Sequence, residues 1–219
     1  MGLDMYLFKY PRVEGFTRED IALLANIHTD IMRHRRDAPP DLYMFDESCI
    51  DQAEQLIASA EISYASWDWR EEFPRSSLET EVAYWRKANA IHAYFVDAVQ
   101  DGEDDCDFHH EVTPDVLRDL KDRCRKIIES TVMVNSKIKN GMRYDFDTGT
   151  WKDIMEEGKV VINPDVCRRL LPTESGCFFG STDYDEWYIE DITYTYDTCD
   201  RLLRETDFDH EMLFYVSSW

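Results

Sequence analysis

Hydrophobic residues form short runs at the two ends of the chain and recur at helical spacing between those runs. Residues 3–10 and 212–219 are rich in aromatic and β-branched side chains and are bounded by turn-forming or acidic residues, as strands are. Residues 61–69 form a third run of this kind. We expect the two terminal strands to pair and the three strands to form a small antiparallel sheet.

Apolar positions three and four residues apart predict helices in most of the remaining chain. The clearest helix begins at Thr113, a capping residue followed by Pro114, and its apolar stripe continues to Thr131. Asp183 and Glu186 resemble a capping box that begins the last helix, although the threonines and tyrosines of that segment leave a strand in its middle open. The six predicted helices occupy residues 17–34, 46–57, 81–96, 113–131, 163–171 and 183–203.

The predicted fold class is α+β, a single mostly helical domain with a small antiparallel sheet that joins the N- and C-terminal strands. A chain of 219 residues with 43% hydrophobic content is long enough to bury a sizeable core, and we assign residues 1–219 to one domain. The pattern predicts no regular structure for residues 136–159, which we expect to be an irregular connection.

The predicted helix 81–96 carries polar side chains on its apolar half. At about 100° per residue, His92 falls in the middle of that half and Asn89 falls at its margin, beside Trp85. A buried imidazole or amide needs hydrogen-bond partners, because an unsatisfied one costs about 1–3 kcal/mol. We therefore expect Trp85, Asn89 and His92 to line a pocket for a planar polar ligand, with Arg86 or Lys87 reaching its charge.

Two other interpretations of the polar residues remain open. His92 could be a core histidine that hydrogen bonds to a backbone carbonyl or a carboxylate of the protein itself. Alternatively, an enzyme acting on a nucleotide would use His92 as a general base. We favour a protein that binds without catalysis and predict no catalytic residue.

A second candidate region is the stretch of residues 171–188, in which Gly176 and Gly180 bracket a short apolar run. We expect Ser181, Tyr184 and Trp187 to contact the ligand from this stretch, as a lid or a pocket wall. The alternative is a turn whose own acidic residues cap the following helix. Those acids would repel a phosphate, and the spacing matches neither known glycine-rich phosphate motif, so the stretch is not a phosphate loop by itself.

Composition limits the remaining chemistry. Six scattered cysteines without close pairs indicate reduced thiols and not a zinc site or a disulfide framework. Residues 101–111 contain six acids and two adjacent histidines but match no calcium loop, so we predict no metal site and no cofactor. No apolar stretch is long enough to cross a membrane and no secretion signal is visible, so we expect a cytoplasmic protein without a membrane partner.

The formal charge of −22, from 46 acids and 24 bases, disfavours direct binding of nucleic acid. The charges are segregated along the chain. Residues 118–143 hold eight bases and three acids, and residues 183–211 hold eleven acids and two arginines. The alternative function is therefore an acidic inhibitor that mimics nucleic acid and occupies the binding channel of a host protein.

Four ordered motifs carry a resemblance to a known family: MGLDMYL at the start, YWRKANAIHAYFV, LLPTESGCFFGSTDYDEWY and FYVSSW at the end. With these motifs the whole chain resembles a family of proteins encoded by phages and prophages. At Cys177 the chain departs from the aromatic residue that this family tends to carry. The resemblance implies an accessory protein that acts in the cytoplasm of the bacterial host, and it implies no particular activity.

Together these observations predict a phage accessory protein that sequesters a small polar, nucleotide-like ligand. A role against host defence is an analogy with other phage accessory proteins. The sequence leaves open the identity of the ligand, the host target and the oligomeric state.

Overall fold

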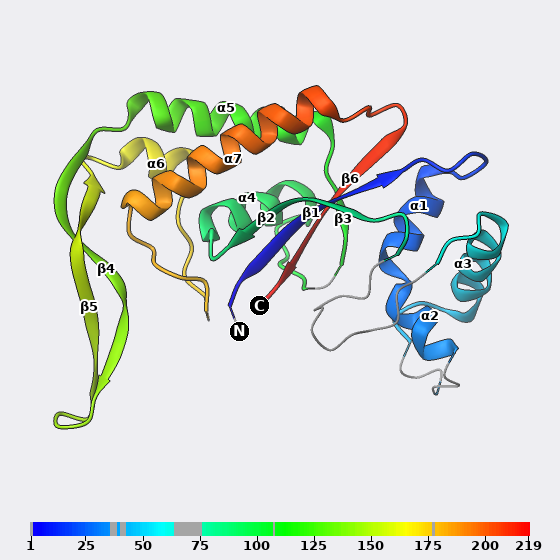
Figure 1. Cartoon of the computed structure of the whole chain (residues 1–219), viewed down its shortest axis with the longest axis horizontal. Helices are drawn as coiled ribbons and strands as arrows, with labels where there is room; N and C mark the ends of the chain where they lie inside the picture. The colour runs from blue at the N-terminus through cyan, green and yellow to red at the C-terminus, as the bar shows by residue number, and fades with distance from the viewer. Residues whose placement is uncertain (1, 36–38, 40–42, 64–75, 107, 177) are drawn as a thin grey trace.

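The fold is α+β, as the sequence predicts, with the terminal strands joined in one small antiparallel sheet (Figure 1). The computed structural model describes residues 2–35, 39, 43–63, 76–106, 108–176 and 178–219. In chain order the elements are β1 (Asp4–Pro11), α1 (Arg18–Asn26), α2 (His28–His34), α3 (Glu47–Ser59), β2 (Thr80–Arg86), α4 (Asn89–Val99), β3 (His110–Glu111), α5 (Pro114–Ser130), β4 (Met133–Asp145), β5 (Thr150–Val161), α6 (Asp165–Leu170), α7 (Glu186–Glu205) and β6 (Glu211–Ser218).

The central sheet has the strand order β2-β1-β6-β3, and all its pairs are antiparallel. Strands β1 and β6 pair along their whole length, from Asp4 opposite Ser218 to Pro11 opposite Glu211, which confirms the predicted pairing of the chain ends. The strand predicted at residues 61–69 lies outside the described residues from 64 onward, and residues 61–63 form no strand.

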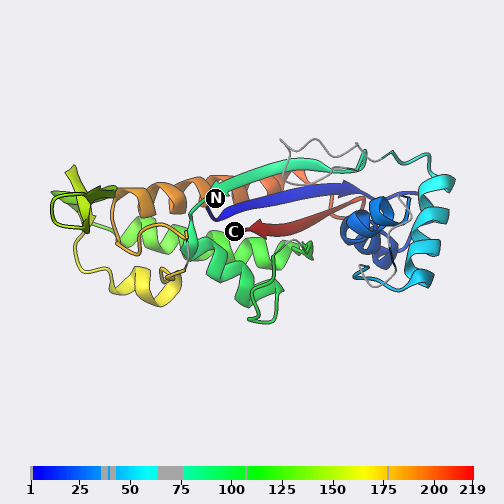
Figure 2. The ribbon, with the colours of Figure 1, turned by 90° about the horizontal axis from the view of Figure 1, so that it is seen from below.

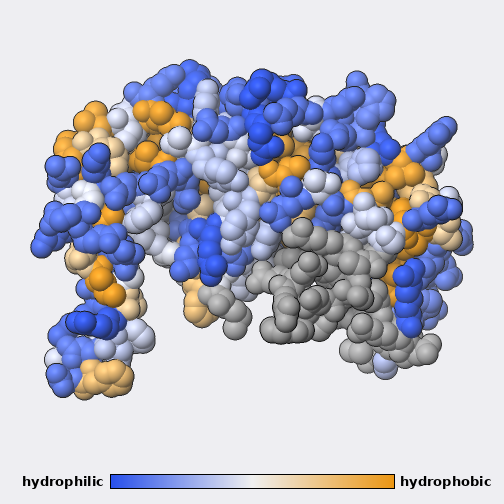
Figure 3. Space-filling view, in the orientation of Figure 1, coloured by the Kyte–Doolittle hydropathy of each residue, from blue (hydrophilic) through white to orange (hydrophobic). Residues whose placement is uncertain are grey.

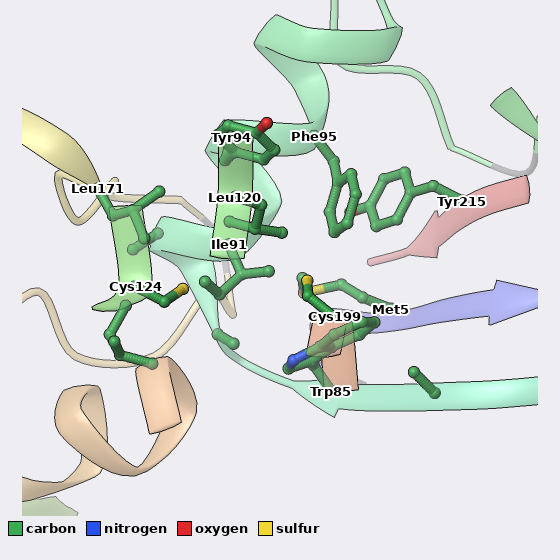
Figure 4. Packing of buried hydrophobic residues seen from close by; sticks show 14 of the residues in the cluster. Met5, Trp85, Ile91, Tyr94, Phe95, Leu120, Cys124, Leu171, Cys199 and Tyr215 are labelled. Atoms are coloured by element: carbon green, nitrogen blue, oxygen red, sulfur yellow. The ribbon is translucent and has the colours of Figure 1, made fainter. Parts of the chain in front are cut away.

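Helices cover both faces of the two central strands, which explains why their sequences are almost continuously apolar. On one face, Leu7 and Tyr215 belong to a large core shared with α4, α5 and α7. In that core the rings of Phe95 and Tyr215 stack with centroids 4.3 Å apart (Figure 4). On the other face, Phe8 and Phe214 pack in a second cluster with residues of α1. Figure 2 shows the three long strands side by side.

Most helix starts follow the capping signals in the sequence. Thr17 and Asp20 form a capping box at α1, Asp46 caps α3 and Thr113 caps α5. The helix predicted at residues 17–34 is interrupted at Ile27, so α1 and α2 are separate. The last helix begins at Glu186, later than predicted. It is continuous to Glu205, so its middle contains no strand.

The helix predicted at residues 81–96 is wrong in its first half. Residues 80–86 form the edge strand β2, and the helix begins only at Asn89. Along β2 the side chains of Ala83 and Trp85 are buried while Tyr84 and Arg86 are exposed, which is the period of two typical of a strand. Lys87, with a φ of 61°, turns the chain between strand and helix. Trp85 and Asn89 are therefore not one helical turn apart, as the predicted site required.

Residues 133–161, most of which the sequence left unassigned, form a long antiparallel hairpin of β4 and β5. Its turn is held by Asp145, whose carboxylate accepts from the backbone N–H groups of Asp147 and Thr148 at 2.9 and 3.2 Å. The hairpin projects from one end of the molecule, and a recess separates its outer half from the body (Figure 3). The exposed aromatic side chains of Tyr144, Phe146 and Trp151 cluster near its tip.

Candidate functional site

A pocket of about 920 Å³ lies between the hairpin and the loop that precedes α7. Its volume falls within the usual range for small-molecule sites, about 300–1,000 Å³. The hairpin contributes one wall, which includes Lys139, Met142 and Asp153. Figure 3 shows the recess between the hairpin and the body of the molecule. The opposite wall includes Phe178 and Trp187, whose side chains are 56% and 45% exposed.

Five of the eight predicted ligand-binding residues line this pocket. They are Arg86, Lys87, Asn89, Ser181 and Trp187. The two stretches that carry them, at the end of β2 and before α7, are far apart in the sequence and were proposed independently. The tertiary structure brings them to one surface, while Trp85, His92 and Tyr184 take other positions.

Backbone in the left-handed region shapes the contact between these two stretches. Lys87 and Phe178 have φ values of 61° and 70°, and Gly180 has a φ of 95°. A Cβ atom on Gly180 would lie 3.1 Å from Lys87 Cβ and 3.3 Å from the Lys87 carbonyl oxygen. Only glycine avoids both the strain and the crowding there, so Gly180 lets the loop approach the β2–α4 turn closely.

Arg86 and Lys87 form a cationic corner of the pocket. A Cβ atom placed on Gly2 would lie 3.7 Å from Arg86 Nη2 and 3.4 Å from Lys87 Cε. The side chains of Arg86 and Lys87 therefore both pass close to Gly2. Arg86 is 59% exposed and its Nε lies 3.9 Å from an oxygen of Asp4. Lys87 has no ion-pair partner within the described part of the chain. Both cations are therefore accessible to an anionic group.

Asn89 anchors the loop and does not offer its amide to a ligand. Its Nδ2 donates to the carbonyl oxygens of Phe179 and Ser181 at 3.1 and 2.8 Å, and its Oδ1 accepts from the N–H of Glu174 at 3.0 Å. The side chain is only 3% exposed. A single amide thus fixes Glu174 on one side, and Phe179 and Ser181 on the other, beside the pocket.

His92 is a core histidine, as the alternative interpretation proposed. It is 1% exposed, its Nδ1 lies 2.7 Å from the Tyr215 hydroxyl and its Nε2 lies 3.1 Å from Asp104 Oδ2. Both ring nitrogens are therefore satisfied by the protein. Trp85 is also buried (Figure 4). Its indole N–H donates to Thr195 Oγ1 at 2.9 Å. These two residues support the pocket from behind.

Ser181, Tyr184 and Trp187 differ in their availability. The Ser181 hydroxyl accepts from the N–H of Asp183 at 3.1 Å, within an exposed turn. Tyr184 lies in an adjoining pocket of about 400 Å³, where its hydroxyl accepts from the N–H of Thr173 at 3.2 Å and its ring lies under the Arg168 guanidinium. Trp187 presents an indole to the larger pocket, and it is the aromatic surface on which a planar ligand can stack.

Two carboxyl groups that the sequence reading did not single out as ligands line the same pocket. Asp185, the N-cap of α7, is 1% exposed, and its Oδ1 accepts from the N–H groups of Trp187 and Tyr188 at 3.0 and 3.2 Å. Its Oδ2 is buried without a partner among the described residues. Burial raises the pKa of Asp185 and raises the pKa of Asp191 to about 7, with Glu190 and Asp185 adding to the second shift.

The hairpin side of the pocket was also missed. The only available signal was the turn-forming run after Tyr144, in which two aspartates and a glycine separate alternating residues typical of strands. Asp185 was visible as part of an acidic helix start, but no sequence pattern indicates that one of its oxygens lacks a partner. That property depends on what packs around it.

Other acidic features are largely occupied by neighbours. Asp104 and Asp105 of the segment 101–111 contact His92 and His110, and the part of the chain that the structure describes holds no group of three or more potential metal ligands. The basic and acidic segments meet where α5 packs on α7, for example in the 2.6 Å pair of Lys121 and Asp200. Free thiols are found at all five described cysteines.

The described helices include none with the length and apolar character of a membrane span. Comparison of the chain with protein-family models, with curated proteins and with solved structures gives no match. The resemblance to phage and prophage proteins therefore stays a prediction, and the functional argument depends on the geometry of the pocket.

Proposed function

We propose that this protein binds a small polar ligand of the nucleotide type in the pocket between the hairpin and the loop before α7. The observation that carries the proposal is the combination, within 920 Å³, of two accessible cations at Arg86 and Lys87 with the exposed indole of Trp187. A nucleotide has both an anionic phosphate and a planar base, so it matches both features.

The physical roles follow from the chemistry of each group. The planar guanidinium of Arg86 can donate hydrogen bonds to two phosphate oxygens, and the ammonium group of Lys87 adds a positive charge beside it. A base that stacks on Trp187 buries apolar surface on both sides, which is worth about 1–3 kcal/mol per stacked base. Lys139 contributes less, because it is already paired with Asp153 at 2.7 Å.

The proposal differs from the sequence expectation in how it uses the buried residues. Asn89, His92 and Trp85 act as positioning residues that hold the loop and the end of β2, while Arg86, Lys87 and Trp187 contact the ligand. Binding without catalysis remains our proposal, and so does an accessory role in the cytoplasm of a bacterial host. A sequestered nucleotide is lost to host pathways that need it.

Titration calorimetry of the purified protein against GMP, AMP, CMP and UMP tests the proposal. We expect at least one nucleotide to bind with a dissociation constant in the micromolar range. The double variant Arg86→Ala with Lys87→Gly should weaken that binding at least tenfold, and Trp187→Ala should weaken it by a similar factor. Glycine suits position 87 because the residue has a positive φ.

The matched control is Arg118→Ala with Arg125→Ala, which also removes two positive charges, from exposed positions on α5 away from the pocket. It should leave nucleotide affinity within twofold. The proposal is wrong if no nucleotide binds at 1 mM, or if this control weakens binding as much as the double variant at positions 86 and 87 does. The second result would mean that only the overall charge matters.

The acidic-mimic alternative has less support from the contacts. Two acids of α7 are paired with bases, Asp200 with Lys121 and Arg204 and Glu205 with Arg201, so fewer free carboxylates face solvent than the sequence suggested. Binding to a host protein through the acidic surface stays an open prediction.

A further inference from the structure

The carboxyl pair of Asp185 and Asp191 is left over once the phosphate and stacking groups have been assigned. Both line the pocket that also contains Trp187. Asp191 lies four residues after Trp187 on α7, which places the two side chains on the same face of the helix, one turn apart. Asp185 precedes Trp187 at the helix start. The indole therefore shares its helix face with Asp191, while Asp185 lines the pocket from the start of the same helix.

The buried oxygen of Asp185 is the observation that points to a ligand. Its Oδ1 accepts the hydrogen bonds of the helix cap. Its Oδ2 has no partner among the described residues, although the residue is only 1% exposed. An unsatisfied buried polar atom normally costs about 1–3 kcal/mol. A donor group supplied from the pocket would remove this cost.

A metal ion does not fit these groups well. The described residues contain no cluster of three or more histidine, cysteine, aspartate or glutamate side chains that could hold one. Among the nearby cations of the chain, Lys139 is paired with Asp153 and Arg168 lies over the ring of Tyr184. Arg86 and Lys87 also line the pocket, and the proposed function assigns them to the phosphate. A ligand with N–H donors is the remaining partner for two acceptor groups beside an aromatic ring.

We propose that Asp185 and Asp191 select a guanine base by accepting hydrogen bonds from its N1–H and 2-amino groups. This inference rests on the proposed function, because it places the base on Trp187 and the phosphate at Arg86 and Lys87. The edge of guanine presents two adjacent N–H donors, which match carboxylate oxygens. Adenine presents one amino group beside a ring nitrogen that is an acceptor, and this nitrogen would meet the carboxylates unfavourably.

Selection of this kind is expected to be strong. A site built to hydrogen bond a donor rejects analogues that lack it, because its own buried polar groups are then left without partners. Inosine monophosphate keeps N1–H but lacks the 2-amino group, so its affinity should fall between those of GMP and AMP. A guanidinium compound such as agmatine offers a similar pair of donors without a phosphate or an aromatic ring.

Calorimetric titrations with GMP, IMP, AMP and agmatine test the inference. GMP should bind at least tenfold tighter than AMP. Asp191→Asn and Asp185→Asn should each lower GMP affinity at least tenfold and leave AMP affinity within twofold. Asn at position 185 retains an oxygen for the helix cap, and Asp191→Asn serves if the first variant folds poorly. The control Asp197→Asn removes an exposed carboxylate from the same helix and should not change the preference.

The outcomes separate this inference from the proposed function. Equal affinities for GMP and AMP would overturn the guanine assignment and leave nucleotide binding intact. Tighter binding of agmatine than of GMP would also overturn it, in favour of a guanidinium ligand. If no nucleotide binds, both proposals fail. An unchanged GMP preference in both aspartate variants would show that other groups select the base.

Discussion

At the scale of single residues, a buried polar side chain proved to be evidence of internal satisfaction more often than of a ligand. Asn89 and His92 attracted attention because they interrupt an apolar surface. Both make their hydrogen bonds within the protein, Asn89 to three backbone groups and His92 to Tyr215 and Asp104. Asp185 is the opposite case, since it reads as an ordinary helix cap and yet has an oxygen without a partner among the described residues.

Asn89 provides a direct test of this view. Asn89→Ala leaves two carbonyl oxygens and one N–H without their partner, so we expect the free energy of unfolding to fall by about 2–4 kcal/mol. Urea unfolding followed by circular dichroism measures this change. Asn140→Ala is the control, because that exposed amide donates only to Glu156 and its loss should cost under about 0.5 kcal/mol. Similar losses in the two variants would contradict the anchoring role of Asn89.

At the scale of elements, the site depends on how closely two irregular segments approach each other. The turn from β2 to α4 and the loop before α7 meet at Lys87 and Gly180, and both residues have positive φ. The sequence marked each segment by its unusual residues but contained no information on their mutual distance. The hairpin β4–β5 then supplies the second wall.

A pair of glycine variants separates strain from close approach. Gly180→Ala places a methyl group 3.3 Å from the Lys87 carbonyl oxygen at a φ of 95°, whereas Gly15→Ala has a similar φ of 85° and no atom within 4 Å. We expect both to lower stability by about 1 kcal/mol through backbone strain, and Gly180→Ala by about 1–2 kcal/mol more through crowding. Thermal and urea unfolding of the two variants measures the difference. Equal losses would mean that the loop does not press against Lys87.

At the scale of the whole molecule, burial of histidines links stability to pH. Burial lowers the pKa of His28 to about 4 and that of His109 to about 3, with the charges of His28 and His110 adding to the second shift. Since these folded values lie below the ordinary 6.5, the folded state favours the neutral rings. Their contribution to stability is therefore complete above pH 6.5 and is lost as pH falls from 6.5 toward 4.

We expect the two histidines to lower the free energy of unfolding by about 2 kcal/mol or more between pH 7 and pH 4.5, at about 1.4 kcal/mol per pH unit for each histidine whose pKa is depressed. Asp191, whose pKa is raised to about 7, acts in the opposite direction over this range, so the contribution of the histidines to the drop is measured by comparing variants. His109→Phe should reduce this drop, because phenylalanine keeps a ring among Phe8, Tyr10 and Phe214 but takes up no proton. His210→Ala, at a site 79% exposed, is the control and should not change it. Urea titrations at the two pH values measure the drop, and a full drop in His109→Phe would contradict the role of this histidine.

The sequence alone determined the features that depend on local chemistry. Capping at Thr17, Asp46 and Thr113 and the apolar runs at the two chain ends correctly predicted helix starts and the pairing of β1 with β6. These signals are reliable because a cap or a buried strand constrains residues that are neighbours in the chain. Where helical and strand periods both fitted, as in residues 80–86, the local pattern was ambiguous and the prediction was wrong.

Only the tertiary structure decided which residues share a site. Arg86, Lys87, Ser181 and Trp187 line one pocket because the backbone of two distant segments packs together, and because a hairpin with no clear local signal closes the other side. The same packing satisfied Asn89 and His92 and left Asp185 with an oxygen that has no partner in the part of the chain that the structure describes. Whether a polar group is satisfied depends on atoms that are close in space and remote in the chain, so the periodicity of a sequence cannot determine it.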